Sequence, residues 1–135
     1  MYYYNVDSKT KKDVIAMKSI LIIGMGGFGH HLVNKLIEQG KTQVMVVDKK
    51  EDNIRDMFGT VTNARIGDCT KKDVLKALKI DTYDEVIVCI EKDFQNSLEV
   101  TSLVKEAGAK YVTSVASRDI HAKFLLRNGA DEVVY

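Results

Sequence analysis

The 135-residue sequence contains no proline, and it has few cysteines, no excess of either charge and no long apolar run. Its 20 basic and 19 acidic residues give a formal net charge of +1, which gives no reason to expect binding to nucleic acid or to an anionic membrane. The longest apolar runs, such as Ile20 to Ile23, are far shorter than the roughly 20 residues that span a bilayer. Direct membrane insertion is not expected, so any membrane role would go through a partner.

The only cysteines are Cys69 and Cys89. They form no C-x-x-C pair and have no zinc-finger spacing with histidine, so no metal site is predicted. The first residues carry no secretion signal, which makes the cytoplasm the default compartment. Two cysteines that pack reduced in the interior are the simplest interpretation. Cys69 is the one thiol expected in an exposed loop, and redox sensing through it is the alternative.

Residues 1–17 differ in composition from the rest of the chain. They hold three of the six tyrosines and a polar run over 7–13, and they lack a sustained apolar period. We interpret 1–17 as an N-terminal leader, linker or tag, and a flexible tail is favoured over an ordered arm. Residues 18–135 are predicted to form the folded domain.

From residue 18 onward, short apolar strands alternate with helical patterns. Strands are predicted at 19–23, 43–47, 64–66, 85–90, 111–115 and 132–135, and helices at 28–39, 51–58, 71–78, 94–107 and 118–127. Strict alternation with strands this apolar predicts an α/β fold, a doubly wound parallel six-stranded Rossmann-like sheet with helices on both faces. The expected strand order is 3-2-1-4-5-6.

A glycine-rich turn, G-M-G-G-F-G at 24–29, directly follows the first predicted strand and opens a helix. In this context the pattern predicts a phosphate-binding turn. Gly24 would permit the tight turn, Gly26 the approach of a phosphate to the backbone, and Gly29 close packing of the helix on the sheet. Free backbone amides at the positive helix end would then bind the phosphates.

Two acidic residues follow the next strands. Asp48 ends the second strand, where a carboxylate accepts hydrogen bonds from ribose hydroxyls and repels a 2′-phosphate, although Lys49 and Lys50 weaken that argument against NADP. Alternatively, Asp48 only begins a turn or caps the helix expected at Glu51. Asp68 either accepts from the adenine amine or forms an Asx turn leading to Thr70, the expected helix cap. The predicted nucleotide-binding residues are Gly24, Met25, Gly26, Gly27, Phe28, Gly29, Asp48, Lys49, Asp68, Cys69 and Ile90.

Taken together, these motifs resemble those of the RCK/KTN (TrkA-N) family of potassium channel and Trk/Ktr-type potassium uptake regulators. The resemblance covers about residues 18 to 135. It is carried by Gly24-x-Gly26-x-x-Gly29, Asp48, Gly67-Asp68-x-Thr70, Asp84 to Ile90, Asn96, Lys105-Glu106-x-Gly108 and Gly129 to Val134.

The resemblance implies a cytoplasmic nucleotide-sensing regulatory domain that gates potassium transport through a membrane channel or transporter subunit, peripheral to the inner face of the cell membrane. It implies binding of NAD(H), ATP or ADP, or an AMP-type ligand, and homodimers that assemble into a larger ring. Gly27 stands where ATP-sensing members often have arginine, a role that His30 or His31 would have to fill. Family members usually continue past Val134 into a second subdomain, so the chain is expected to be an excised domain or a partial subunit.

Two other classes remain open at this stage. An NAD-dependent oxidoreductase fragment would share the fold, but the sequence has no Y-x-x-x-K motif, no P-loop and no second domain for a substrate. A nucleotide-binding module unrelated to ion transport is the other alternative, because function does not follow from fold. We predict a protein that is not an enzyme and has no catalytic residues.

Overall fold

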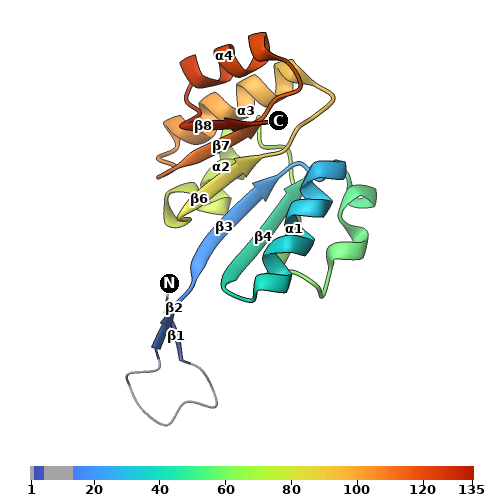
Figure 1. Cartoon of the computed structure of the whole chain (residues 1–135), viewed down its shortest axis with the longest axis vertical. Coiled ribbons are helices and arrows are strands. Elements are labelled where there is room, and N and C mark those ends of the chain that lie inside the picture. Colours follow the sequence, from blue (N-terminus) through green and yellow to red (C-terminus); the bar gives the residue numbers. More distant parts are fainter. Residues whose placement is uncertain (1, 5–13) are drawn as a thin grey trace.

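The computed structural model describes residues 2–4 and 14–135 (Figure 1). Its main sheet is parallel and has six strands in the order β5-β4-β3-β6-β7-β8. This order confirms the predicted doubly wound topology. The strands are β3 (Lys18–Ile23), β4 (Thr42–Asp48), β5 (Asn63–Ile66), β6 (Glu85–Val88), β7 (Val112–Val115) and β8 (Glu132–Val134).

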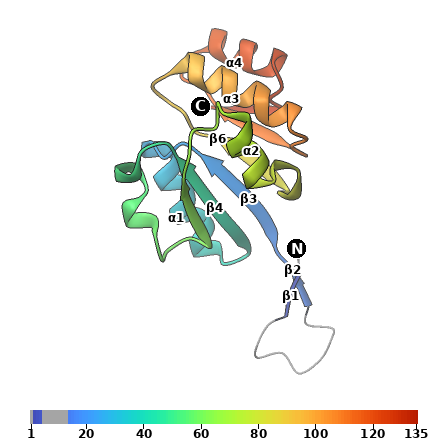
Figure 2. The ribbon, with the colours of Figure 1, turned by 180° about the vertical axis from the view of Figure 1, so that it is seen from behind.

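Helices cover both faces of this sheet, as predicted. One face carries α1 (Gly27–Gln39), which is in front of the sheet in Figure 1. The opposite face, turned to the viewer in Figure 2, carries α2 (Lys72–Leu78) and α3 (Phe94–Glu106), with α4 (Asp119–Arg127) packed against α3 and β8.

The strand residues alternate between two cores. In β3, Ile20 and Ile22 pack with the α1 side, whereas Leu21 and Ile23 pack with the α2 and α3 side. All four side chains are at most 3% exposed. Burial on both faces explains why the strand is a continuous apolar run and not an alternating one.

Two predicted element boundaries were wrong. Residues 51–58 form two 3-10 turns, Glu51–Asn53 and Arg55–Met57, and not one helix. They are separated by the buried Ile54, whose φ of −124° lies outside the helical range. The fourth strand ends at Val88, although the Cys89 amide still donates to the Ile23 carbonyl (2.7 Å) before the chain leaves the sheet.

Part of the predicted leader is described. Strands β1 (Tyr2–Tyr4) and β2 (Val14–Ala16) pair antiparallel as a separate two-stranded sheet, drawn beside the start of β3 in Figure 1. Residues 1 and 5–13 lie outside the described residues. The assignment of 1–17 to a leader, linker or tag stays a prediction. Within the described ranges, no helix has the length and apolar character that a membrane span needs.

Candidate functional site

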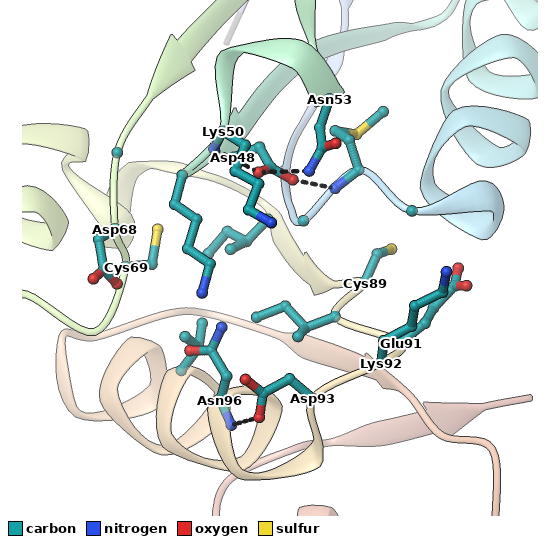
Figure 3. A pocket seen from close by; sticks show the side chains of 18 of the residues that line it. Asp48, Lys50, Asn53, Asp68, Cys69, Cys89, Glu91, Lys92, Asp93 and Asn96 are labelled. Carbon is teal, nitrogen blue, oxygen red and sulfur yellow. Dashed lines mark hydrogen bonds between the residues drawn. The ribbon is translucent and has the colours of Figure 1, made fainter.

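A pocket of about 460 Å³ opens at the carboxyl ends of the central strands, where the strand order reverses (Figure 3). Ligands bind at this place in doubly wound sheets. Most of the predicted site residues line it, namely Gly24, Met25, Gly26, Gly27, Asp48, Lys49, Asp68, Cys69 and Ile90. Phe28 and Gly29 are not among the lining residues.

The glycine turn fits closely against the end of β6. Gly24 has a φ of +89°, and a Cβ on it would lie 2.9 Å from the Cys89 carbonyl oxygen. A Cβ on Gly29 would lie 2.8 Å from the Gly24 carbonyl oxygen. A side chain at position 24 would push the turn away from the end of β6, and one at position 29 would push α1 away from the turn, which is why both are glycine.

The turn presents free backbone amides to the pocket. Gly26 and Gly27 are exposed, and within residues 14–135 their amides donate no hydrogen bond to a side chain or a loop carbonyl. The first turn of α1 contains no acidic residue. The positive end of α1 can thus accept an anion from elsewhere.

Asp48 holds the turn from the β4 side. Its Oδ2 accepts the Met25 amide (2.9 Å), and its Oδ1 accepts the Lys50 amide (2.8 Å) and the Asn53 side-chain amide (3.1 Å). The carboxylate is buried, and Oδ2 has a single donor among the described residues. Because a carboxylate oxygen has two lone pairs, Oδ2 can accept one more hydrogen bond from the pocket.

Asp68 forms the Asx turn that was one of the two expectations for it. Its Oδ1 accepts the Thr70 hydroxyl (2.6 Å) and the Thr70 amide (2.9 Å), and these two bonds lower the pKa of Asp68 below its ordinary value of 3.8. The predicted Thr70 cap was wrong. Helix α2 has Lys71 at its N-cap position and no side-chain cap, so the helix begins one residue later than predicted and Thr70 precedes the cap position.

Cys69 is buried, so the expectation of an exposed thiol was wrong. Burial, together with the charges of Asp68 and Asp48, raises the pKa of Cys69 to about 12. Burial and the charge of Glu91 raise the pKa of Cys89 to about 12 as well. Both side chains stay as thiols at neutral pH, which makes them poor nucleophiles and poor redox sensors.

The two histidines of α1 do not line the pocket. The Nε2 of His30 lies 3.0 Å from the Asn53 carbonyl, and its Nδ1 lies 4.0 Å from Asp56. This ring is therefore directed to the 3-10 turns of the α1 face. The lining of the pocket thus gives no support to His30 or His31 as a substitute for the arginine that the resemblance implies at position 27.

Several pocket residues were not predicted as site residues. Six of them follow strands β4 or β6, and the most informative is Glu91, whose Oε1 accepts the Phe28 amide (2.7 Å). Asp93 accepts the Asn96 amide (3.0 Å) and caps α3 (Figure 3). Their place directly after an apolar strand was the available signal. The unpredicted lining residues are Ile23, Lys50, Asn53, Gly67, Cys89, Glu91, Lys92, Asp93, Asn96 and Val100.

The sheet order and the glycine turn define a Rossmann-like domain of the kind that places a ligand pocket at the strand ends. The chain belongs to the TrkA-N domain family, which matches residues 20–135. The predicted family is thereby confirmed.

Two curated relatives are potassium uptake proteins. The chain is 37% identical over 118 residues to Ktr system potassium uptake protein C of Bacillus subtilis (strain 168), and these residues are 87% of this chain and 53% of the relative. It is 35% identical over 117 residues to Ktr system potassium uptake protein A of Vibrio alginolyticus, with the same two shares. The chain thus spans about half the length of these relatives.

Solved structures share the fold at low sequence identity. The GsuK channel bound to NAD matches 98% of this chain and 23% of its own, with a TM-score of 0.74 and 19% identity. GsuK bound to ADP matches 88% and 31%, with a TM-score of 0.74 and 21% identity. A xanthine dehydrogenase from Bacillus halodurans also matches, over 87% of this chain and 36% of its own, with a TM-score of 0.69 and 18% identity. The fold alone therefore does not separate a regulator from an enzyme.

Proposed function

We propose that this domain binds an adenine nucleotide in the pocket at the glycine turn and regulates potassium transport through a membrane partner. The observation that carries this proposal is the pairing of free turn amides at Gly26 and Gly27 with the buried carboxylate of Asp48 across one pocket. Amides suit the phosphates, and a carboxylate suits a ribose hydroxyl.

The pocket has room and chemistry for the remaining parts of such a ligand. Asp68 keeps its Oδ2 free of the Asx turn, because both Thr70 bonds go to Oδ1. In our proposal Oδ2 faces the adenine amine, while Cys69 and Ile90 supply apolar contacts for the ring. Lys49 and Lys50 are exposed at the rim and would attract the anionic ligand.

The relatives support the regulatory part of the proposal. Both curated relatives are named as potassium uptake proteins, and the GsuK structures are named with NAD and with ADP. We propose NAD(H), ADP, ATP or an AMP-type nucleotide as the ligand, and a membrane potassium channel or transporter subunit as the partner. We also propose that the domain works in the cytoplasm as a homodimer within a larger ring. In this proposal the ring has two geometries, and different nucleotides favour different ones. Each nucleotide must therefore bind one ring geometry more tightly than the other.

Isothermal titration calorimetry with ADP, ATP, AMP, NAD and NADH tests the ligand. We expect saturable binding of at least one of them, weakened about tenfold for every ribose-containing ligand by Asp48→Asn, because the neutral amide is a poorer acceptor for the ribose hydroxyl. Glu106→Gln is a matched control, since it removes an exposed carboxylate remote from the pocket. Absence of binding for all five nucleotides at millimolar concentration would overturn the proposal.

The oxidoreductase alternative makes a different prediction. An enzyme would consume NADH steadily in the presence of a reducible substrate, whereas a sensor leaves NADH unchanged. We expect no loss of the 340 nm absorbance of NADH with panels of aldehydes, ketones and quinones. Turnover with any of them would favour the enzyme class.

A further inference from the structure

A carboxylate of the protein itself lies against the amides of the glycine turn. The Oε1 of Glu91 accepts the Phe28 amide in the first turn of α1 (2.7 Å). A Cβ built on Gly26 would lie 3.2 Å from the Glu91 Cδ and 3.3 Å from each carboxylate oxygen. Glu91 therefore uses the space that the glycine at position 26 leaves open.

We propose that Glu91 is a specificity-determining residue that occupies the phosphate position of the pocket in the absence of a ligand. A ligand with a phosphate at the glycine turn must displace the Glu91 carboxylate, whereas a ligand without one leaves it in place. This inference rests on the proposed adenine-nucleotide site and deepens it. The pocket thereby discriminates among adenine ligands by the charge that they bring to the turn.

The contacts of Glu91 explain why it takes this position. Helix α1 begins without an acidic side chain of its own, so its positive end lacks an anion until Glu91 supplies one. A bond from an amide to a carboxylate is stronger than one between neutral groups. Among the described residues Glu91 makes no salt bridge that would offer its charge an alternative partner.

Displacement of Glu91 is feasible but unfavourable. The residue is exposed and its side chain is long, so the carboxylate can turn into solvent without unfolding anything. The ligand nevertheless has to replace the bond to the Phe28 amide, and any carboxylate that stays near the phosphate repels it. The cost therefore applies to ADP, ATP and NAD, and not to adenosine.

Calorimetry on the whole chain tests this discrimination with ADP and adenosine as probes. We expect Glu91→Gln and Glu91→Gly each to tighten ADP about tenfold, while the affinity for adenosine changes less than about twofold. Glu106→Gln, which changes the net charge equally, should leave both affinities unchanged. Equal ADP affinity in the wild type and both Glu91 variants would overturn the inference and leave the proposed site standing. If neither the wild type nor any variant bound ADP or adenosine, this inference would fail, and the titration with all five nucleotides would decide the proposed function separately.

A second readout needs no nucleotide. In the ligand-free wild type, the amide proton of Phe28 should resonate downfield, because it donates to a carboxylate at short distance. Glu91→Gly should move this signal upfield, while Glu106→Gln should leave it in place. An unchanged Phe28 signal in the Glu91 variant would show that the carboxylate does not bind this amide, and would overturn the inference.

Discussion

The two sides of the glycine turn are held by carboxylates in very different surroundings. On the β4 side, Asp48 is only 8% exposed and accepts hydrogen bonds from three donors. On the β6 side, Glu91 is exposed and accepts the Phe28 amide alone. Two carboxylates therefore contact the same six-residue turn, one from a buried position with three donors and one from an exposed position with a single donor.

Burial decides which purpose each carboxylate serves. A buried carboxylate is costly unless it is fully hydrogen-bonded, and the donors that it satisfies would themselves be orphaned by its loss. Asp48 is thus part of the folded structure of the turn. An exposed carboxylate with one bond can exchange that bond for water at little cost, so the Glu91 side of the turn is the side at which a ligand can compete.

Among the substitutions that test this difference between the two carboxylates, Asp48→Ala should have the largest effect on stability. The Met25 amide is buried and would lose its acceptor, as would Lys50 and Asn53. We expect the free energy of unfolding to fall by about 2–3 kcal/mol, because an unsatisfied buried donor costs its full desolvation. Urea denaturation followed by circular dichroism measures it.

Asp48→Asn serves as the graded control. Its amide oxygen can still accept a hydrogen bond from one of these donors. The free energy of unfolding should therefore fall about half as much as in the alanine variant, by roughly 1 kcal/mol. A fall of less than about 0.5 kcal/mol in the alanine variant would contradict the view that Asp48 holds the turn, since surface substitutions commonly have effects of that size.

Asp68 is a third carboxylate at the pocket, and it is half-buried, between Asp48 and Glu91 in exposure. We expect the loss of one of its hydrogen bonds to have an effect of intermediate size. Its bond to the Thr70 hydroxyl is the largest cause of its lowered pKa. We expect Thr70→Val, which keeps the amide bond and the shape of the side chain, to raise the pKa of Asp68 toward 3.8. Titration of the Asp68 side-chain carbon signal by NMR measures this shift, and an unchanged pKa would show that the hydroxyl bond is not formed in solution.

The sign of the linked stability follows from this direction. Because the pKa of Asp68 is lower in the folded state, the ionised carboxylate stabilises the fold at pH values above 3.8, and that contribution is lost as the pH falls through the folded-state pKa. Thr70→Val should therefore destabilise the protein most at neutral pH, and the difference from the wild type should shrink in acid.

Local patterns in the sequence predicted the sheet and half of the site. The apolar runs identified the strands because every central strand is buried on both faces. Gly24 and Gly29 were identified from the glycine pattern between a strand and a helix, and the structure supplies the reason, since a side chain at either position would clash. Asp48 was identified from its place at the end of a strand, and the structure puts it at the pocket.

The errors have a common physical cause, which is competition that a local pattern does not encode. Thr70 matched a helix cap, but Thr70 belongs to the Asx turn of Asp68, and α2 begins only at Lys72. The region 51–58 matched a helix, but the buried Ile54 takes a non-helical φ of −124° and divides the segment into two 3-10 turns. Glu91 was missed because its bond to Phe28 joins residues that are 63 positions apart in the sequence.

The smallest effect is expected for Glu91→Gln, and it tests the comparison directly. The side chain is exposed, its one hydrogen bond can be replaced by water or by the glutamine oxygen, and the Phe28 amide lies at an open helix end. The free energy of unfolding should change by no more than about 0.5 kcal/mol in urea denaturation. A loss as large as that of Asp48→Ala would mean that both carboxylates hold the turn equally, and a ligand would then have no exchangeable side at which to enter. If Glu91→Gln leaves the free energy of unfolding nearly unchanged while Asp48→Ala lowers it strongly, then Asp48 at the end of β4 holds the turn. The contact with Glu91 after β6 would then be one that a ligand can replace.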